Sequence, residues 1–123
     1  MILRIVRAAI IAGREEELSD AFRLVAHAAL PEIPGLLRGT FGRNMHDGGE
    51  RVILATLWSD WQSLRAAIGD DWDRPHFFAG LHDLIHDVSV EHYEVGAEYI
   101  HGAGLTMPVP TWDQSDVPSA PIQ

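Results

Sequence analysis

The sequence contains no cysteine, which excludes disulfides, thiolate metal ligands and a cysteine nucleophile. It contains no lysine either, so neither Schiff-base catalysis nor a phosphate-binding loop with its lysine is possible. No apolar stretch is long enough to be a membrane span. Positive charge is scarce, because 18 acidic residues outnumber 9 arginines and leave a formal net charge of −9. Such a surface disfavours nucleic acids and anionic membranes as partners.

What remains is enough chain for one globular domain. The 123 residues are 46% hydrophobic and 22% charged, which is an ordinary composition for a globular protein. The apolar stretch 2–12 is interrupted by Arg4 and Arg7 at strand spacing, whereas a signal peptide has its charges before an unbroken apolar run. We therefore predict an N-terminal strand and a cytoplasmic protein.

The hydrophobic periodicity alternates between strand and helix spacing along the first 95 residues. Turn and cap residues separate the segments, notably Asp47-Gly48-Gly49 between two strands, and Ser59 or Asp60 before a helix. Two helical segments precede the last strand. The predicted strands are residues 1–11, 36–46, 51–58 and 88–95, and the predicted helices are residues 14–30, 59–68 and 75–86.

This order is β-α-β-β-α-β, the ferredoxin-like arrangement of the α+β class. Its sheet has helices on one face only. In the second strand, the alternation predicts Leu37, Phe41 and Met45 on one face, and the third strand has apolar residues on both faces. The face without helices must therefore also be buried, and packing two sheets together achieves this. We predict a homodimer that forms a dimeric α+β barrel.

Residues 99–123 differ in composition from the predicted barrel domain, residues 1–98. The segment from His101 onward contains four prolines and two glycines, which is typical of an extended chain. We predict an extended C-terminal tail that packs across the dimer, with Trp112 as its anchor.

Several motifs occur in the order and at the spacing of a known family. They are the Pro34-Gly35-Leu36 step into the second strand, Leu57-Trp58-Ser59-Asp60 at the end of the third, His76, and Val90 to Val95 in the last strand. Over residues 1 to about 98 the sequence resembles the antibiotic biosynthesis monooxygenase superfamily. The resemblance implies the dimeric α+β barrel.

One branch of that superfamily comprises cofactor-independent monooxygenases. There, a phenol or hydroquinone is deprotonated in a pocket between sheet and helices, and its anion reduces dioxygen. The resemblance places Trp58 at the tryptophan of this site, whereas Leu54 and Leu64 stand where the family has an asparagine and a tyrosine. We expect His76 to be the proton-transfer group, and the apolar walls of the cleft to be Trp58, Phe77 and Leu54. By strand position, the candidate donors to a substrate oxyanion are Arg7, Arg38, Asn44 and His46.

A second branch binds and degrades heme. His76 lies near the family's spacing for the axial iron ligand, which makes a heme-binding and possibly heme-oxidising protein the first alternative. The tryptophan that distorts heme in this branch is replaced by Ala67, and the first strand contains no asparagine.

Three histidines admit other roles. His82 and His86 lie four residues apart on the predicted helix 75–86, a spacing that can hold a divalent metal and is also common on solvated helical faces. His92 and Tyr93 face opposite sides of the last strand, so one of them faces the pocket or the dimer interface.

The leading interpretation is an oxidoreductase, a monooxygenase that acts on an aromatic, quinol or polyketide-like compound. Dioxygen is its expected co-substrate, and no organic cofactor is expected. A non-catalytic ligand-binding or assembly barrel is the second alternative, favoured by the long C-terminal segment with Trp112.

Overall fold

The computed structural model describes residues 1–73 and 81–109, apart from the side chains of Asp47 and His82. His76, Phe77 and Trp112 lie outside these described residues. The elements along the described chain are β1 (Ile2–Ile10), α1 (Glu15–Ala28), η1 (Leu30–Glu32), β2 (Leu36–Arg43), η2 (Asp47–Gly49), β3 (Arg51–Trp58), α2 (Trp61–Ile68), η3 (His82–Leu84), β4 (Ile85–Glu94), β5 (Glu98–Ile100) and β6 (Gly104–Thr106), where η denotes a 3-10 turn.

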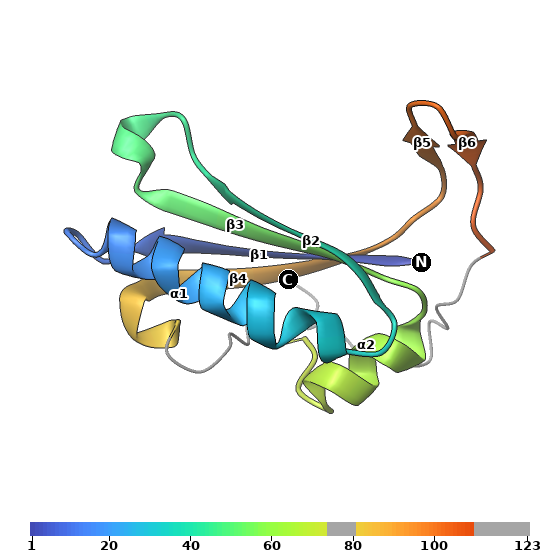
Figure 1. Ribbon diagram of the computed structural model, residues 1–123, viewed down its shortest axis with the longest axis horizontal. Coiled ribbons are helices and arrows are strands. Elements are labelled where there is room, and N and C mark those ends of the chain that lie inside the picture. The colour runs from blue at the N-terminus through green and yellow to red at the C-terminus, as the bar shows by residue number, and fades with distance from the viewer. Residues whose placement is uncertain (74–80, 110–123) are drawn as a thin grey trace, which may run out of the picture.

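The four long strands form one antiparallel sheet in the order β2-β3-β1-β4. At its centre, Val6 of β1 lies between Leu54 of β3 and Val90 of β4. Helices α1 and α2 both lie on one face of this sheet (Figure 1). The predicted ferredoxin-like α+β fold is confirmed.

Helix α2 begins where its capping residue predicts. The Asp60 carboxylate accepts a hydrogen bond from the Ser63 amide at 2.7 Å, and this bond lowers the pKa of the carboxyl group. The Gly69 amide closes the other end by donating to the Arg65 carbonyl. Neither described helix is both long and apolar enough to cross a bilayer.

The start of β4 corrects the sequence prediction of a helix through His86. Strand β4 begins at Ile85, directly after η3, and His86 lies opposite Ala9 of β1. An apolar pair such as Leu84-Ile85 fits a helix or a strand equally well. As a strand, this segment pairs with backbone N–H and C=O groups of β1 that a helix would leave without a strand partner. The helical spacing between His82 and His86 is therefore absent.

Irregularities in β2 and β4 change which side chains share a face. In β2 the register shifts between Leu36 and Arg38, so Leu37 is exposed and does not share the buried face with Phe41. Met45 lies beyond the end of β2 and is also exposed, so the prediction that it shares a face with Phe41 is wrong. In β4 the shift lies beside Asp87, whose φ is 55°.

Two separate apolar clusters form the core between sheet and helices. The first joins α1 to the ends of β1 and β4, and the second joins α2 to the opposite end of the sheet. The first consists of Ala8, Ile10, Leu18, Val52, Leu81, Leu84 and Ile85. The second consists of Ile2, Trp58, Trp61, Leu64 and Trp72.

A two-stranded hairpin, β5–β6, follows β4 and lies on the side of the sheet away from the helices (Figure 1). Glu98 of the hairpin accepts a hydrogen bond from Arg38 of β2 at 2.6 Å. Tyr99 and Leu105 are cross-strand partners that are 68% and 66% exposed. The sequence predicted an extended chain from residue 99 and missed this hairpin.

Candidate functional site

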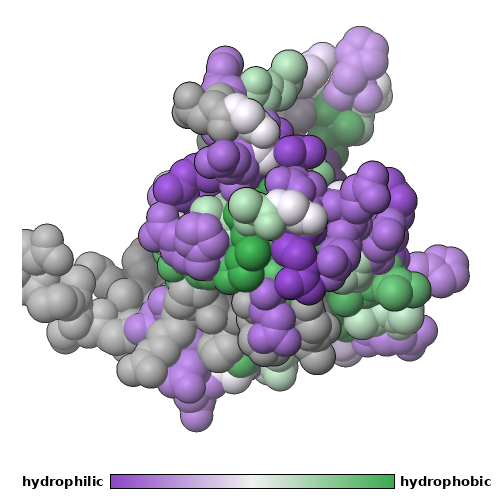
Figure 2. Space-filling model, turned by 90° about the vertical axis from the view of Figure 1, so that its left-hand side faces the viewer, coloured by the Kyte–Doolittle hydropathy of each residue, from purple (hydrophilic) through white to green (hydrophobic). Residues whose placement is uncertain are grey.

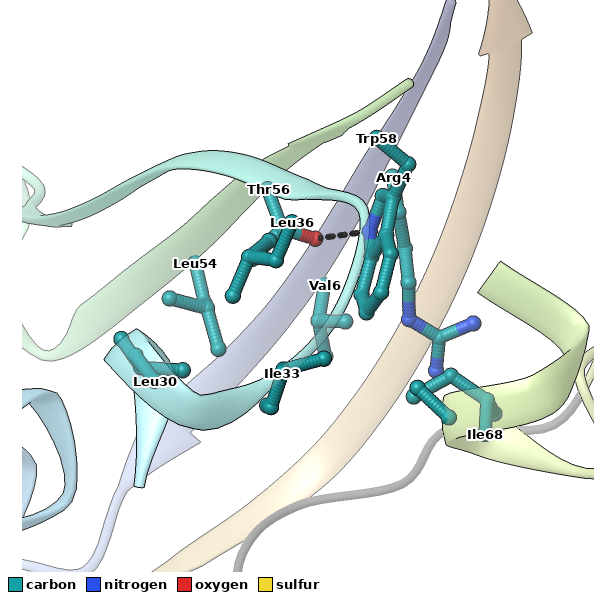
Figure 3. Close-up of a pocket in the computed structure, with 10 residues that line it drawn as sticks. Arg4, Val6, Leu30, Ile33, Leu36, Leu54, Thr56, Trp58 and Ile68 are labelled. Carbon is teal, nitrogen blue, oxygen red and sulfur yellow. Dashed lines mark hydrogen bonds between the residues drawn. The ribbon is translucent and has the colours of Figure 1, made fainter. Parts of the chain in front are cut away.

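A cavity of about 270 Å³ lies between the sheet and the segments η1 and α2. Its walls are mainly apolar, with Arg4 and Thr56 as the polar exceptions. Figure 3 shows that its lining comes from β1, β3, the η1–β2 segment and α2. The lining residues are Arg4, Val6, Leu30, Ile33, Leu36, Leu54, Thr56, Trp58, Ala67 and Ile68.

Trp58 is fixed by a hydrogen bond within its own strand. Residues 56 and 58 lie on the same face of β3, because side chains alternate along a strand. The Trp58 indole N–H donates to the Thr56 hydroxyl at 3.0 Å (Figure 3). This bond satisfies a buried polar group and holds the indole against the cavity.

Arg4 is the buried charge of the site, with only 2% of its surface exposed. Its Nη1 donates to the Trp72 carbonyl at 2.7 Å and to Nε2 of His92 at 2.8 Å. Burial lowers the pKa of Arg4 to about 10, because desolvation disfavours the charged form. The guanidinium is therefore still charged at neutral pH.

His92 is a neutral partner for that charge. Its pKa is lowered to about 4, first by burial and then by the nearby Arg4 charge, while Asp73 acts in the opposite direction. A neutral ring can offer Nε2 as acceptor to Arg4. Trp61 and Trp72 enclose the ring edge-on, with centroids 6.2 and 5.1 Å away.

The structure separates the residues that the sequence proposed for one site. Trp58 and Leu54 line the cavity, as expected. Arg38 pairs with Glu98 on the opposite face of the sheet. Arg7 also lies on that face, where it forms an ion pair with Glu91.

Arg7 and Asn44 instead line a second hollow, of about 260 Å³, towards the β2–β3 turn. There the Asn44 amide oxygen accepts a hydrogen bond from the backbone amide of His46, whose side chain is exposed. Figure 2 views this end of the molecule, where hydrophilic residues surround a hydrophobic band. The structure therefore does not bring Arg7 or Asn44 to Trp58.

The histidine pair proposed for metal binding lies at the η3–β4 junction. His86 is exposed on β4, and the neighbouring Asp87 accepts a hydrogen bond from Arg51 at 2.9 Å. Within residues 1–73 and 81–109, no three histidine, aspartate or glutamate side chains are grouped as a metal site would require.

Sequence reasoning missed Arg4 and Thr56, and it left open which of His92 and Tyr93 faces the pocket. The alternation of side chains along the first strand could have located Arg4, because it places Arg4 on the same face as Ile2 and Val6, the face that is covered by the helices. The sequence placed His92 and Tyr93 on opposite faces, and the structure shows that His92 faces Arg4. The Tyr93 hydroxyl lies on the opposite face and hydrogen-bonds to the Glu91 carboxylate.

Comparison with known proteins gives matches among solved structures. No protein-family model matches the chain, and no curated protein matches it. A variant of the heme degrader MhuD, with two manganese protoporphyrins bound per active site, is 26% identical at a TM-score of 0.58. The match covers 77% of this chain and 94% of that protein. MhuD from Mycobacterium tuberculosis with two hemes in its active site is 24% identical, with the same TM-score and coverages of 77% and 95%.

Other matches include an oxygenase and proteins described as monooxygenases. A variant of SnoaB, a cofactor-independent oxygenase from Streptomyces nogalater, is 21% identical at a TM-score of 0.58, covering 76% of this chain and 91% of SnoaB. A Bordetella bronchiseptica protein described as an antibiotic biosynthesis monooxygenase is 16% identical at a TM-score of 0.59. The match covers 76% of this chain and 95% of that protein. The chain therefore has the fold that these proteins share, several of which are described as antibiotic biosynthesis monooxygenases.

Proposed function

We propose that this protein is a cofactor-independent oxygenase that acts on an electron-rich aromatic compound such as a quinol or a polyketide. The observation that carries the proposal is the apolar cavity with Trp58 held against it. Its volume lies near the lower end of the range typical of small-molecule sites, about 300–1,000 Å³, and so suits a compound of a few rings. The fold similarity to SnoaB supports the same chemistry.

The proposed reaction oxidises an activated ring carbon. The substrate loses a proton, and its anion reduces dioxygen. In a substrate with a ring CH₂ group, such as an anthrone, that group and O₂ become a C=O group and H₂O, so one oxygen atom enters the product and the other leaves as water. Apolar side chains such as Leu54 and Val6 exclude bulk water from the reacting anion. His76 is the proposed proton acceptor.

Oxygen consumption with a panel of quinols and anthrones tests this proposal. We expect uptake with at least one of them, and Trp58→Phe should lower kcat/KM about tenfold, because the smaller ring leaves the substrate less tightly held. Trp61→Phe is the matched control. It alters another buried tryptophan that does not line the cavity, and kcat/KM should stay within about twofold. No uptake with any compound, or equal losses in both variants, would contradict the proposal.

Heme binding is the second candidate, favoured by the similarity to MhuD. The cavity offers apolar walls and the Arg4 charge, which suits a propionate. None of the described lining residues can ligate iron, so the ligand would have to be His76, as the sequence predicts.

Titration with hemin, followed by absorbance, tests this candidate. Heme ligation predicts a sharp Soret shift that saturates at one heme per subunit and is lost in His76→Ala. A shift that persists in the variant would remove His76 as the ligand, and the absence of any shift would remove heme binding.

We propose further that two copies pair through the face of the sheet without helices. The centre of that face carries partly or fully buried apolar side chains, namely Leu3, Ile5, Ile53, Ala55 and Leu57. The hairpin adds the exposed pair Tyr99 and Leu105 on the same side of the sheet. An isolated two-stranded hairpin is marginally stable, so a second subunit that covers this pair would stabilise it.

The mass in solution tests the proposed dimer. Wild type should have twice the 13.6 kDa mass of one chain. Leu105→Glu should shift it towards the monomer, because it places a charge in a buried apolar contact. Leu24→Glu is the control, since Leu24 is 72% exposed on α1, on the other side of the sheet. A monomeric wild type, or a dimer unaffected by Leu105→Glu, would contradict this interface.

The same variant tests the assembly alternative. If the protein serves only as a non-catalytic barrel, Leu105→Glu should change oligomer mass while no quinol or anthrone supports oxygen uptake by either protein.

A further inference from the structure

We propose that the Thr56 hydroxyl is the hydrogen-bond donor of the cavity, and that it selects ligands with an acceptor oxygen on their ring system, such as an aromatic ketone. Trp58 is the positioning residue that orients this hydroxyl. The inference deepens the proposed function and rests on it, because both assign the ligand to the same cavity.

The first step is the hydrogen-bonding state of Thr56. Its side chain lines the cavity between Leu54 and Trp58 on one face of β3, and only 6% of its surface is exposed. The hydroxyl oxygen accepts a hydrogen bond from the Trp58 indole N–H at 3.0 Å. Among the described residues, none accepts a hydrogen bond from the hydroxyl itself, although buried donors in proteins almost always have an acceptor. The O–H group is therefore available to an acceptor that enters the cavity.

The second step is the orientation of this donor. The Trp58 indole occupies one side of the Thr56 oxygen (Figure 3), so the O–H bond has to turn away from it. A hydroxyl that accepts one hydrogen bond is polarised and donates the next one more strongly. The indole has a single N–H group, and Thr56 accepts it. Trp58 therefore acts on the oxygen of a ligand through Thr56.

The third step is the space beside Thr56. Gly39 of β2 lies opposite Thr56 in the β2–β3 pair. A Cβ at residue 39 would lie 3.6 Å from the Leu30 side chain and 4.0 Å from the Thr56 methyl group, and both of these residues line the cavity. A side chain longer than that of alanine would therefore extend from residue 39 into the cavity. Glycine at this position leaves the space beside Thr56 to a ligand.

9-Fluorenone and fluorene are suitable probes, because they share one ring system and differ only in a C=O group that replaces CH₂. Wild type should prefer 9-fluorenone. The ratio of the fluorene to the 9-fluorenone dissociation constant should fall about three- to tenfold in Thr56→Val, which keeps the shape of the side chain and removes the hydroxyl. Thr56→Ser keeps the hydroxyl and should hold the ratio within about twofold of wild type. Thr40→Val, on the opposite face of the sheet, should leave the ratio unchanged.

The infrared band of the bound ketone reports the hydrogen bond directly. In wild type, the C=O stretch of 9-fluorenone should lie at a lower wavenumber than in hexane, because a hydrogen bond to the oxygen weakens the C=O bond. Thr56→Val should move the band towards its position in hexane, whereas donation by Arg4, the other polar residue of the lining, would leave it in place.

The wild-type band needs no variant, so it covers the case in which Thr56→Val does not fold. A band at the hexane position in wild type, or no binding of 9-fluorenone to wild type, would overturn the donor. So would a ratio and a band that stay unchanged in a folded Thr56→Val protein.

Trp58 is tested by a double-mutant cycle on the same ratio. Trp58→Phe removes the N–H group that orients the hydroxyl and should lower the preference for 9-fluorenone. Thr56→Val should then lower the ratio less in the Trp58→Phe background than in wild type, because the two residues act as a unit. A tryptophan that only packs against the ligand would weaken the binding of both probes alike. An unchanged ratio in Trp58→Phe, or additive effects, would overturn the positioning role.

Oxygen uptake separates this inference from the proposed function. A preference for 9-fluorenone that depends on Thr56, without uptake by any quinol or anthrone, would overturn the oxygenase and leave the donor in place. Uptake together with a ratio that does not depend on Thr56 would overturn the donor and leave the oxygenase.

Discussion

Gly35→Ala is expected to lower the free energy of unfolding by about 2–5 kcal/mol. Gly35 has a φ of 80°, a left-handed conformation that disfavours any residue with a Cβ. A Cβ at this position would also fall well inside van der Waals contact with Ser63 and 3.1 Å from the Ser59 hydroxyl. The backbone cannot retreat freely, because the Gly35 carbonyl accepts a hydrogen bond from the Ser59 amide at 2.8 Å.

Urea unfolding of Gly13→Ala separates the cost of the backbone conformation from the cost of the steric clash. Gly13 has nearly the same φ, 82°, but no atom lies within 4 Å of the position that a Cβ would take, so only the backbone cost of about 1–2 kcal/mol applies. Ser63→Gly should recover part of the loss in Gly35→Ala, because it removes the side chain in the clash. Equal losses in the two alanine variants, or no coupling to Ser63, would contradict this account.

The Gly35 contact also bears on the site. It joins the segment before β2 to the first turn of α2, and the cavity is lined by Ile33 from that segment and by Ile68 from the last turn of α2. The cavity lies where the sheet, η1 and α2 come together, and the second core cluster, with Trp58 and Trp61, packs alongside it. A shift of α2 away from Gly35 would therefore alter the cavity as well as stability.

Local signals made part of this fold predictable from sequence. The bounds of β3 match the prediction, because a glycine-rich turn precedes it and a capping aspartate, Asp60, follows it. The start of β4 was not predictable, since the choice between helix and strand for Leu84-Ile85 depends on pairing with β1, which is distant in sequence. The β5–β6 hairpin was missed because glycines such as Gly102 and Gly104 are as common in extended tails as in tight turns. Both have positive φ, at or next to the hairpin turn.

The candidate site, like the fold, was predictable from the sequence only where local patterns determine it. The sequence identified Trp58 and Leu54, since both stand in a regular strand whose faces can be counted. It did not separate Arg7 from Arg4, although their odd and even positions place them on opposite faces of β1. The contact between Arg4 and His92 depends on the register between β1 and β4, which no local pattern encodes.

As the pH falls from 6.5 to 4, protonation linked to His92 should lower the free energy of unfolding by up to about 3 kcal/mol. Its pKa is lowered from 6.5 to about 4, by burial first and by the Arg4 charge second. Between these two values the unfolded chain binds a proton that the folded protein does not. Stability from this group is therefore complete above pH 6.5 and is lost as the pH falls towards 4. His92 is half-buried, so solvent screening makes this value an upper limit.

Urea unfolding at several pH values between 7 and 4, for wild type and His92→Gln, isolates this contribution. Glutamine does not titrate, and its amide oxygen can still accept from Arg4, so the variant should lose less stability over the same range. Carboxylates that titrate in both proteins cancel in the difference. His46→Gln, at an exposed histidine, should follow the wild-type curve. Parallel curves for wild type and His92→Gln would show that folding does not hold His92 neutral, and would remove the basis for its role as acceptor to Arg4.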